Sequence, residues 1–231
     1  MKVRIKFCKY GMMKFIGHLD MMRFFQKALR RAEIPVKYTE GYSPHMVMSF
    51  ASPLGVGLTS DGEYFDLELT EEMEEAEALE RLNREMVEGV KVLRFFPVPG
   101  DKKNKAMTLV EAASWTAFPA PGLLPENWKS LLSSFFQQEE ILITKETKRS
   151  SREVNIRPLI YQLEPEGEAI SMLLAAGSRE NLKPELVTGA FCSWAGIPVT
   201  EFSFTYHRKE TFARTADGEL APLDALTGEE S

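Results

Sequence analysis

Hydrophobic and polar residues alternate over the first nine positions of the chain, and a helical spacing follows. Val3, Ile5 and Phe7 alternate with basic residues, so this segment is predicted to be a strand with one buried face and one cationic outer face. Between residues 17 and 32 the apolar side chains, Leu19 among them, recur every three or four positions, which is typical of an amphipathic helix.

The remainder of the first half contains further alternating and helical segments. Strand patterns cover residues 36–41, 46–58 and 63–70, a glutamate-rich helix pattern covers 71–89, and a strand pattern covers 90–98. The order of strand, helix, two or three strands, helix and strand is that of the split βαβ, or ferredoxin-like, arrangement.

The second half repeats this order less clearly. Its predicted elements are a strand over 113–120, a helix over 125–138, two strands around a basic turn within 139–164, a strand over 168–178, a helix over 183–197 and a strand over 199–208. We therefore predict an α+β protein of two tandem ferredoxin-like units with antiparallel sheets. The predicted parts are an N-terminal unit at 1–98, a linker at 99–106, a C-terminal unit at 107–214 and an acidic flexible tail at 215–231.

Composition narrows the class of protein. The chain is 44% hydrophobic and has no apolar run long enough to cross a membrane, and its first residues lack the apolar stretch of a signal peptide. We therefore expect a folded cytoplasmic protein without a membrane partner. Cys8 and Cys192 are far apart in the sequence, so we expect no zinc site, iron–sulfur cluster or other metal or cofactor within the chain.

Charge is distributed unevenly, although the net charge is −6. Residues 1–32 carry a formal charge of +8, whereas residues 61–88 carry −10. The predicted helix presents a basic ridge, which fits either a solvated face or an RNA-binding surface, and a second basic turn follows in the other half. The candidate RNA-binding residues are Arg23, Lys27, Arg30, Arg31, Tyr42, His45, Lys148, Arg149 and Arg152.

Two histidines flank the ridge in sequence and raise the question of catalysis. His18 opens the predicted helix, and His45 follows a stiff turn that contains Gly41 and Pro44. The pair suits metal-independent RNA cleavage as acid and base, with Asp20 nearby, but it equally suits binding alone. Asp20 also has a purely structural interpretation, because a carboxylate in the first helical turn is stabilised by the helix dipole.

A dense motif between residues 15 and 69 resembles a known bacterial family. The segments GHLDMMRFFQKALRRAEIP, GYSPHMVMSFASPLGVG and EYFDLEL are similar to the opening of the radical-SAM-linked proteins, a domain of unknown function. Departures from the family pattern include Gly17 in place of serine and Met46 in place of proline. The family's characteristic positions fall here on His18, Asp20, Arg23, Arg30, Arg31, Gly41, Pro44, His45, Ser49, Pro53, Gly57, Glu63 and Asp66.

The resemblance implies partners rather than a reaction. Members of that family are fused to, or encoded beside, radical-SAM proteins, and this chain resembles the stand-alone form because it lacks their cysteine cluster. Our leading expectation is a non-catalytic RNA-binding or docking module that serves a radical-SAM enzyme acting on ribosomal or transfer RNA, with no DNA partner. The alternatives are an RNA endonuclease using His18 and His45, and a protein adaptor whose acidic residues 61–88 meet a basic partner.

Overall fold

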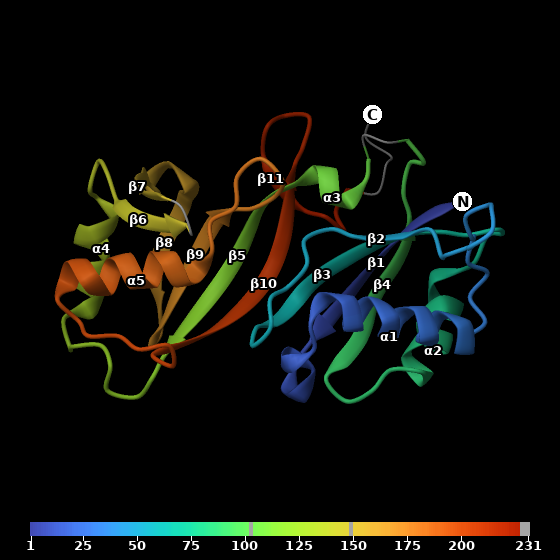
Figure 1. Cartoon of the computed structure of the whole chain (residues 1–231), viewed down its shortest axis with the longest axis horizontal. Helices are drawn as coiled ribbons and strands as arrows, with labels where there is room; N and C mark the ends of the chain where they lie inside the picture. The colour runs from blue at the N-terminus through green and yellow to red at the C-terminus, as the bar shows by residue number, and fades with distance from the viewer. Residues whose placement is uncertain (102–103, 148–149, 227–231) are drawn as a thin grey trace. The chain divides into compact units, whose positions relative to one another are not determined.

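The computed structural model describes residues 1–101, 104–147 and 150–226 (Figure 1). It is a mixed α+β structure with mostly antiparallel strands and a few helices, as the sequence predicts. The chain divides into two compact units: residues 1–111 together with the chain from Arg208 onward, and residues 112–207. We predicted units at 1–98 and 107–214. In the structure the chain from Arg208 onward belongs to the first unit instead of the second. No helix among the described residues is long and apolar enough to cross a bilayer.

The first unit is a sheet with two covering helices. In this sheet β4 pairs with β1, β1 with β3, and β3 with both β2 and β10. Its elements are β1 (Lys2–Lys9), η1 (Gly11–Phe15), α1 (His18–Arg31), β2 (Met48–Phe50), β3 (Thr59–Glu68), α2 (Glu75–Arg84), β4 (Val90–Pro97), α3 (Ala106–Leu109), the later part of β10 (Phe204–Arg214) and β11 (Leu220–Pro222). The predicted strands at 36–41 and 46–58 shrink to β2 and isolated bridges at Val36 and Tyr38.

The core of this unit lies between the sheet and the helices α1 and α2. The odd-numbered apolar residues of β1 are buried there, together with one stripe of each helix. Four aromatic rings form its centre, with neighbouring centroids between 4.7 and 6.2 Å apart: Phe7, Phe25, Phe50 and Phe65. This cluster explains why the helical and strand periodicities of the first half are so clear.

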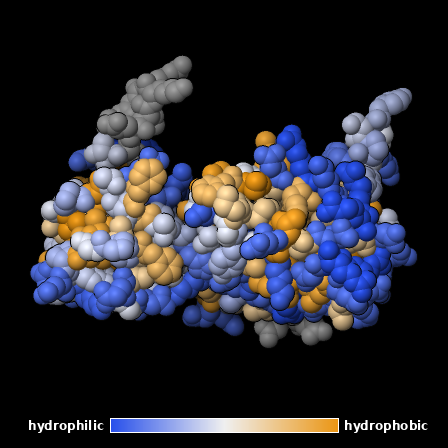
Figure 2. Space-filling view, turned by 90° about the horizontal axis from the view of Figure 1, so that it is seen from below, coloured by the Kyte–Doolittle hydropathy of each residue, from blue (hydrophilic) through white to orange (hydrophobic). Residues whose placement is uncertain are grey.

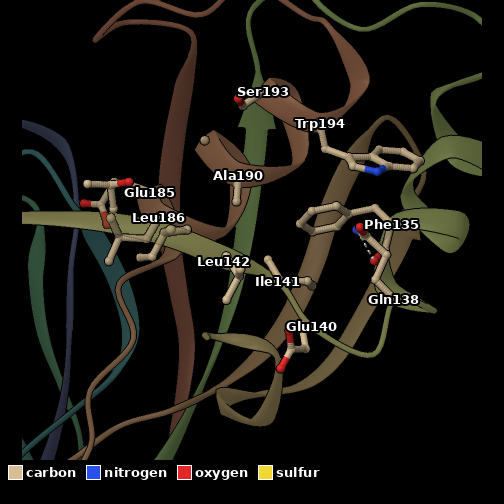
Figure 3. A pocket seen from close by; sticks show the side chains of 13 residues that line it. Phe135, Gln138, Glu140, Ile141, Leu142, Glu185, Leu186, Ala190, Ser193 and Trp194 are labelled. Atoms are coloured by element: carbon tan, nitrogen blue, oxygen red, sulfur yellow. Dashed lines mark hydrogen bonds between the residues drawn. The ribbon is translucent and has the colours of Figure 1, made fainter. Parts of the chain in front are cut away.

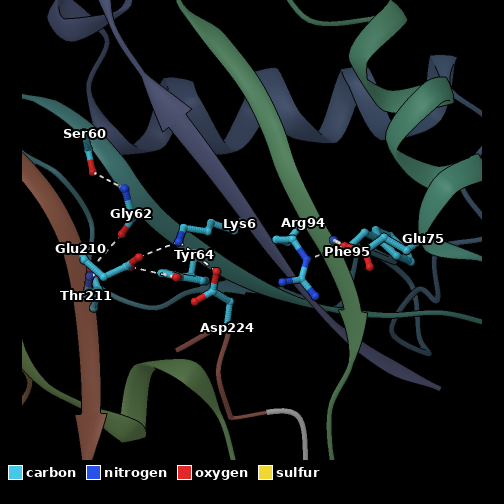
Figure 4. Close-up of polar contacts among 10 residues, drawn as sticks. All are labelled: Lys6, Ser60, Gly62, Tyr64, Glu75, Arg94, Phe95, Glu210, Thr211 and Asp224. Atoms are coloured by element: carbon cyan, nitrogen blue, oxygen red, sulfur yellow. Dashed lines mark hydrogen bonds and ion pairs between the residues drawn. The ribbon is translucent and has the colours of Figure 1, made fainter. Parts of the chain in front are cut away.

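We predicted a cationic outer face on β1, and this prediction is wrong. The basic side chains on that face of β1 are covered and paired. Arg4 is buried and its Nε donates to Asp66 at 2.8 Å, while its Nη2 donates to the carbonyl of Asn104. Lys6 bonds Glu210 at 2.5 Å and Asp224 at 2.9 Å (Figure 4). The segments that begin at Asn104 and at Arg208 cover this face, so the charges are neutralised within the unit.

The C-terminal segment packs onto the first unit through residue 226, whereas we predicted a flexible tail from 215. β11 pairs with β10, and Leu223 is fully buried. The ion pair of Asp224 with Lys6 adds a polar attachment. Residues 227–231 of the predicted tail lie outside the described residues.

In the second unit β9 pairs with both β5 and β8, and the first part of β10 follows β5. The segment that we predicted as two strands forms three, because β6 and β7 pair as a separate hairpin before β8. The elements of this unit are β5 (Val110–Pro119), α4 (Trp128–Phe136), β6 (Leu142–Thr147), β7 (Ser150–Asn155), η2 (Arg157–Leu159), β8 (Ile160–Glu166), β9 (Ala169–Ala175) and α5 (Pro184–Ala195).

Candidate interaction surface

Four exposed apolar side chains gather where η1, the start of α1 and the loop at 51–58 meet. The exposed fractions are 77% for Met12, 55% for Phe15, 60% for Leu19 and 62% for Val56. We call these four residues the apolar patch. The Gly57 N–H donates to the Lys14 carbonyl at 2.8 Å, and a Cβ at Gly17 would lie 3.9 Å from the Val56 side chain, so the loop lies against η1 and the start of α1.

The surface around the patch combines apolar and basic groups. The Lys14 Nζ lies 5.1 Å from the centre of the Phe15 ring, in the geometry of a cation–π contact. Figure 2 shows apolar atoms reaching the surface over η1 and α1, beside hydrophilic ones. Leu19 corrects the sequence-based expectation, because we placed it in the buried stripe of the helix.

A buried polar cluster fixes the loop at 51–58 and the turn between η1 and α1, next to the patch. Arg208 donates from Nη2 to the Glu63 carboxylate at 2.6 Å and to the Ser52 carbonyl at 2.6 Å, which ties down the loop at 51–58. Lys9 is buried as well, and its Nζ donates to the Ile16 carbonyl at 2.8 Å, which fixes the turn between η1 and α1. Burial lowers the pKa of Lys9. The patch is therefore held rigidly from beneath.

The predicted basic ridge lies on the exposed face of α1, and half of it is paired. Asp20 accepts from Arg23 at 3.0 Å, and Glu85 accepts from Arg31 at 2.6 Å. Lys27 and Arg30 are exposed, and no ion pair within the described part of the chain engages either of them. The ridge thus offers fewer free charges than the sequence suggests.

His18 begins α1 after the N-cap residue Gly17, as predicted. Its ring is half-buried and meets Phe50 edge-on, with 5.1 Å between the ring centroids. The histidine therefore covers one end of the aromatic core and joins α1 to β2. No hydrogen bond or ion pair engages its ring among the described residues.

His45 closes a tight exposed loop. The Nδ1 atom of its ring lies 3.1 Å from the Thr39 hydroxyl oxygen, and its backbone N–H donates to the same oxygen at 3.1 Å. The Thr39 N–H in turn donates to the His45 carbonyl at 2.9 Å. Tyr42, at the tip of this loop, is fully exposed. His45 thus shapes the loop that presents Tyr42.

The two histidines lie in different parts of the first unit. His18 contacts Phe50, which lies opposite Phe65 in the pairing of β2 with β3. The chain next to His45 lies further along β3, because the Val47 carbonyl accepts from the backbone N–H of Glu68. Five positions of extended chain separate His45 from Phe50, which is a distance of about 16 Å. An acid and a base acting on one phosphodiester must both reach it, and this placement gives that role no support.

The remaining predicted residues belong to the second unit. Arg152 is exposed on β7, while Lys148 and Arg149 lie outside the described residues. No group of three or more histidine, cysteine or carboxylate side chains suited to a metal ion occurs in the described ranges 1–101, 104–147 and 150–226.

Comparison with known proteins identifies a family without a known activity. Residues 2–184 match the profile of a family described as "Uncharacterized protein conserved in bacteria (DUF2344)". No curated protein matches the sequence. Among solved structures, a chain from the "Crystal Structure of a Cbf5-Nop10-Gar1 Complex" is similar, with 12% identity and a TM-score of 0.46. The match covers 90% of this chain and 48% of the other chain, so this chain spans about half the length of that protein.

Proposed function

Since the chain belongs to the DUF2344 family of uncharacterized bacterial proteins, we propose that it is a non-catalytic docking module whose apolar patch binds a radical-SAM protein. The patch supports docking, and the resemblance of the 15–69 motif to radical-SAM-linked proteins supports the identity of the partner. The order β4-β1-β3, with β2 paired to β3, supports a ferredoxin-like interpretation of the first unit, which we extend to the second.

The exposure of the apolar patch carries this proposal. Single exposed apolar residues are ordinary, but four that gather on neighbouring elements are typical of an interaction site. The buried cluster of Lys9, Glu63 and Arg208 holds them in place, so ordering the surface costs little conformational entropy on binding. Lys14 and Arg23 flank the patch, and a partner surface with an apolar centre and acidic edges complements it.

Binding of RNA is a second candidate, and two observations favour it. Lys27 and Arg30 are exposed on α1 without an ion-pair partner among the described residues, so both are free to meet phosphates. Tyr42 exposes its whole ring on the loop that His45 closes, and an exposed ring of this kind suits stacking on a base.

Co-purification from cells that express both proteins tests the docking proposal. The full chain carries an affinity tag, a radical-SAM protein of the same bacterium is untagged, and the extract is treated with nuclease. We expect wild type and Phe202→Asp to retain the radical-SAM protein and Phe15→Asp to lose it. Phe202 is a matched control, because it is an exposed phenylalanine of the second unit outside the patch. Equal retention by both variants would place the contact elsewhere, and no retention by wild type would remove the proposal.

A further inference from the structure

A groove in the second unit lies between α5, β6 and the end of α4, and it is separate from the apolar patch. Its volume is about 520 Å³. Figure 3 shows Phe135 and Trp194 side by side at one end of it, with 5.8 Å between their ring centroids. Leu142 and Trp194 are each about half exposed at its margin.

The α5 side of the groove is lined partly by residues with small side chains. Gly189, Ala190 and Ser193 line it, and a Cβ added at Gly189 would meet no atom within 4 Å. Between Glu185 and Trp194 the helix rises by about 14 Å, which is the length of about four extended residues. A backbone can therefore approach α5 closely along this stretch.

The other side of the groove is an edge strand. β6 pairs with β7 along one edge, and no other strand of the described chain pairs with it. The Ile141 carbonyl accepts from Ile156 in the direction of β7, so in an antiparallel ladder Leu142 and Thr144 direct their N–H and C=O groups away from β7. Both residues line the groove. An edge of this kind is a template for another strand.

The charge of the groove has one sign. Glu140 and Glu185 are the only ionisable side chains among the described residues that line it. Glu185 also lies in the first turn of α5, where the helix dipole favours a carboxylate, but Glu140 precedes β6 and has no such role. A ligand with Lys or Arg side chains at its ends complements both carboxylates.

We propose that this groove binds an extended peptide segment of a partner protein, which adds as a strand to β6, places alternate apolar side chains against α5 and brings Lys or Arg to Glu140 and Glu185. Main-chain hydrogen bonds to β6 supply affinity, and the aromatic end formed by Phe135 and Trp194 selects a large apolar side chain. This proposal does not depend on the patch of the first unit or on its partner.

Selection from a phage-displayed library of random decapeptides on the immobilised full chain tests the proposal. We expect enriched peptides to alternate apolar with other residues and to carry Lys or Arg near their ends. A synthetic enriched peptide is then titrated by fluorescence anisotropy. N-methylation of alternate backbone nitrogens should abolish its binding in one register and leave it in the other, because only one set of N–H groups meets β6.

Matched variants locate the site. Gly189→Leu fills the groove and should weaken the peptide by at least about tenfold, whereas Gly189→Ala should leave its affinity unchanged. Glu140→Lys should weaken it about tenfold, and Glu139→Lys, an exposed neighbour that does not line the groove, should not. Enrichment of acidic or helically spaced peptides, or full affinity in folded Gly189→Leu and in Glu140→Lys, overturns the proposal. A dimer in sedimentation that Gly189→Leu abolishes assigns the groove to a second copy and also overturns it.

Discussion

The guanidinium of Arg208 lies 2.6 Å from both carboxylate oxygens of Glu63, although 145 residues separate the two in sequence. Both side chains are buried. The pair joins β10 to β3 within the first unit, and the further bond from Arg208 to Ser52 extends it to the loop that carries Val56. The last part of the chain therefore determines the position of a loop near its beginning.

Removal of one member of this pair should be costly. Arg208→Met leaves the Glu63 carboxylate buried without its partner, and we expect the free energy of unfolding to fall by about 3–5 kcal/mol. Urea unfolding followed by circular dichroism measures the loss. The double variant Arg208→Met/Glu63→Leu should recover most of it, because neither charge then remains buried. A double variant as unstable as the single one would show that the pair itself stabilises the fold.

The network of Lys6, Tyr64, Glu210 and Asp224 should make stability fall in alkali (Figure 4). Burial lowers the pKa of Lys6, but its bonds to Glu210 and Asp224 outweigh burial and raise that pKa above 10.5. Burial, with the nearby carboxylates, also raises the pKa of Tyr64 above 10.0. Both groups keep their protons in the folded chain at a pH where the unfolded chain loses them, so stability is complete below about pH 10 and declines above it.

Urea midpoints between pH 8 and pH 11 check this prediction. Wild type should lose stability steeply above pH 10, and Tyr64→Phe should show a shallower slope, because one of the groups that bind protons differently is gone. Asp224→Ala should lower stability at pH 8 by about 1–3 kcal/mol through the lost charged hydrogen bond. An identical alkaline slope in wild type and Tyr64→Phe would contradict the role given to Tyr64.

Two glycines should respond to the same substitution with opposite signs. A Cβ at Gly62 would lie 2.6 Å from the Glu210 Cα, which is backbone that cannot move without disturbing β10. Gly62→Ala should therefore destabilise the protein, and thermal unfolding should show a lower Tm. Gly189→Ala in the open face of α5 should stabilise it by about 1 kcal/mol, since alanine is the better helix former. A stable Gly62→Ala would mean that β3 and β10 do not approach as closely as described.

The RNA candidate makes its own prediction. Lys27→Glu/Arg30→Glu should weaken binding of a single-stranded ribosomal RNA fragment and reduce the dependence of the affinity on salt by about two phosphate contacts. Fluorescence anisotropy at several salt concentrations measures both quantities. Reversal of Glu139, an exposed acidic residue of the second unit, is the charge control. An unchanged salt slope would remove α1 as an RNA-binding surface.

Sequence periodicity predicted the elements whose apolar residues share one core. It failed to predict exposure where a segment distant in sequence covers a polar face. The helix at 17–32 and the strands β1 and β4 follow their patterns closely, whereas β3 begins at Thr59, ahead of the strand predicted at 63–70. The alternation of β1 also predicted a cationic surface, but the segments after Asn104 and Arg208 cover that face, and no local pattern announces a covering segment 100 or more residues away.

The candidate surface was only partly predictable for a related reason. Phe15 lies in a segment without a helical or strand period, and Val56 lies in the segment 46–58, which was predicted as a strand but is a loop beyond Phe50. Nothing in their spacing therefore indicated that the two side chains lie exposed beside one another. Leu19 fits the apolar stripe of α1 by spacing, yet it extends past the end of the core. The family motif marked this region of the chain, but not which of its side chains face outward.

The most direct test of the central claim is a calorimetric titration of the purified radical-SAM protein with the full chain in the absence of RNA. The docking account predicts saturable binding by wild type, the same dissociation constant for Phe202→Asp, and one at least about tenfold higher for Phe15→Asp and for Leu19→Asp. No heat of binding with wild type, or equal affinities for all four proteins, would contradict it.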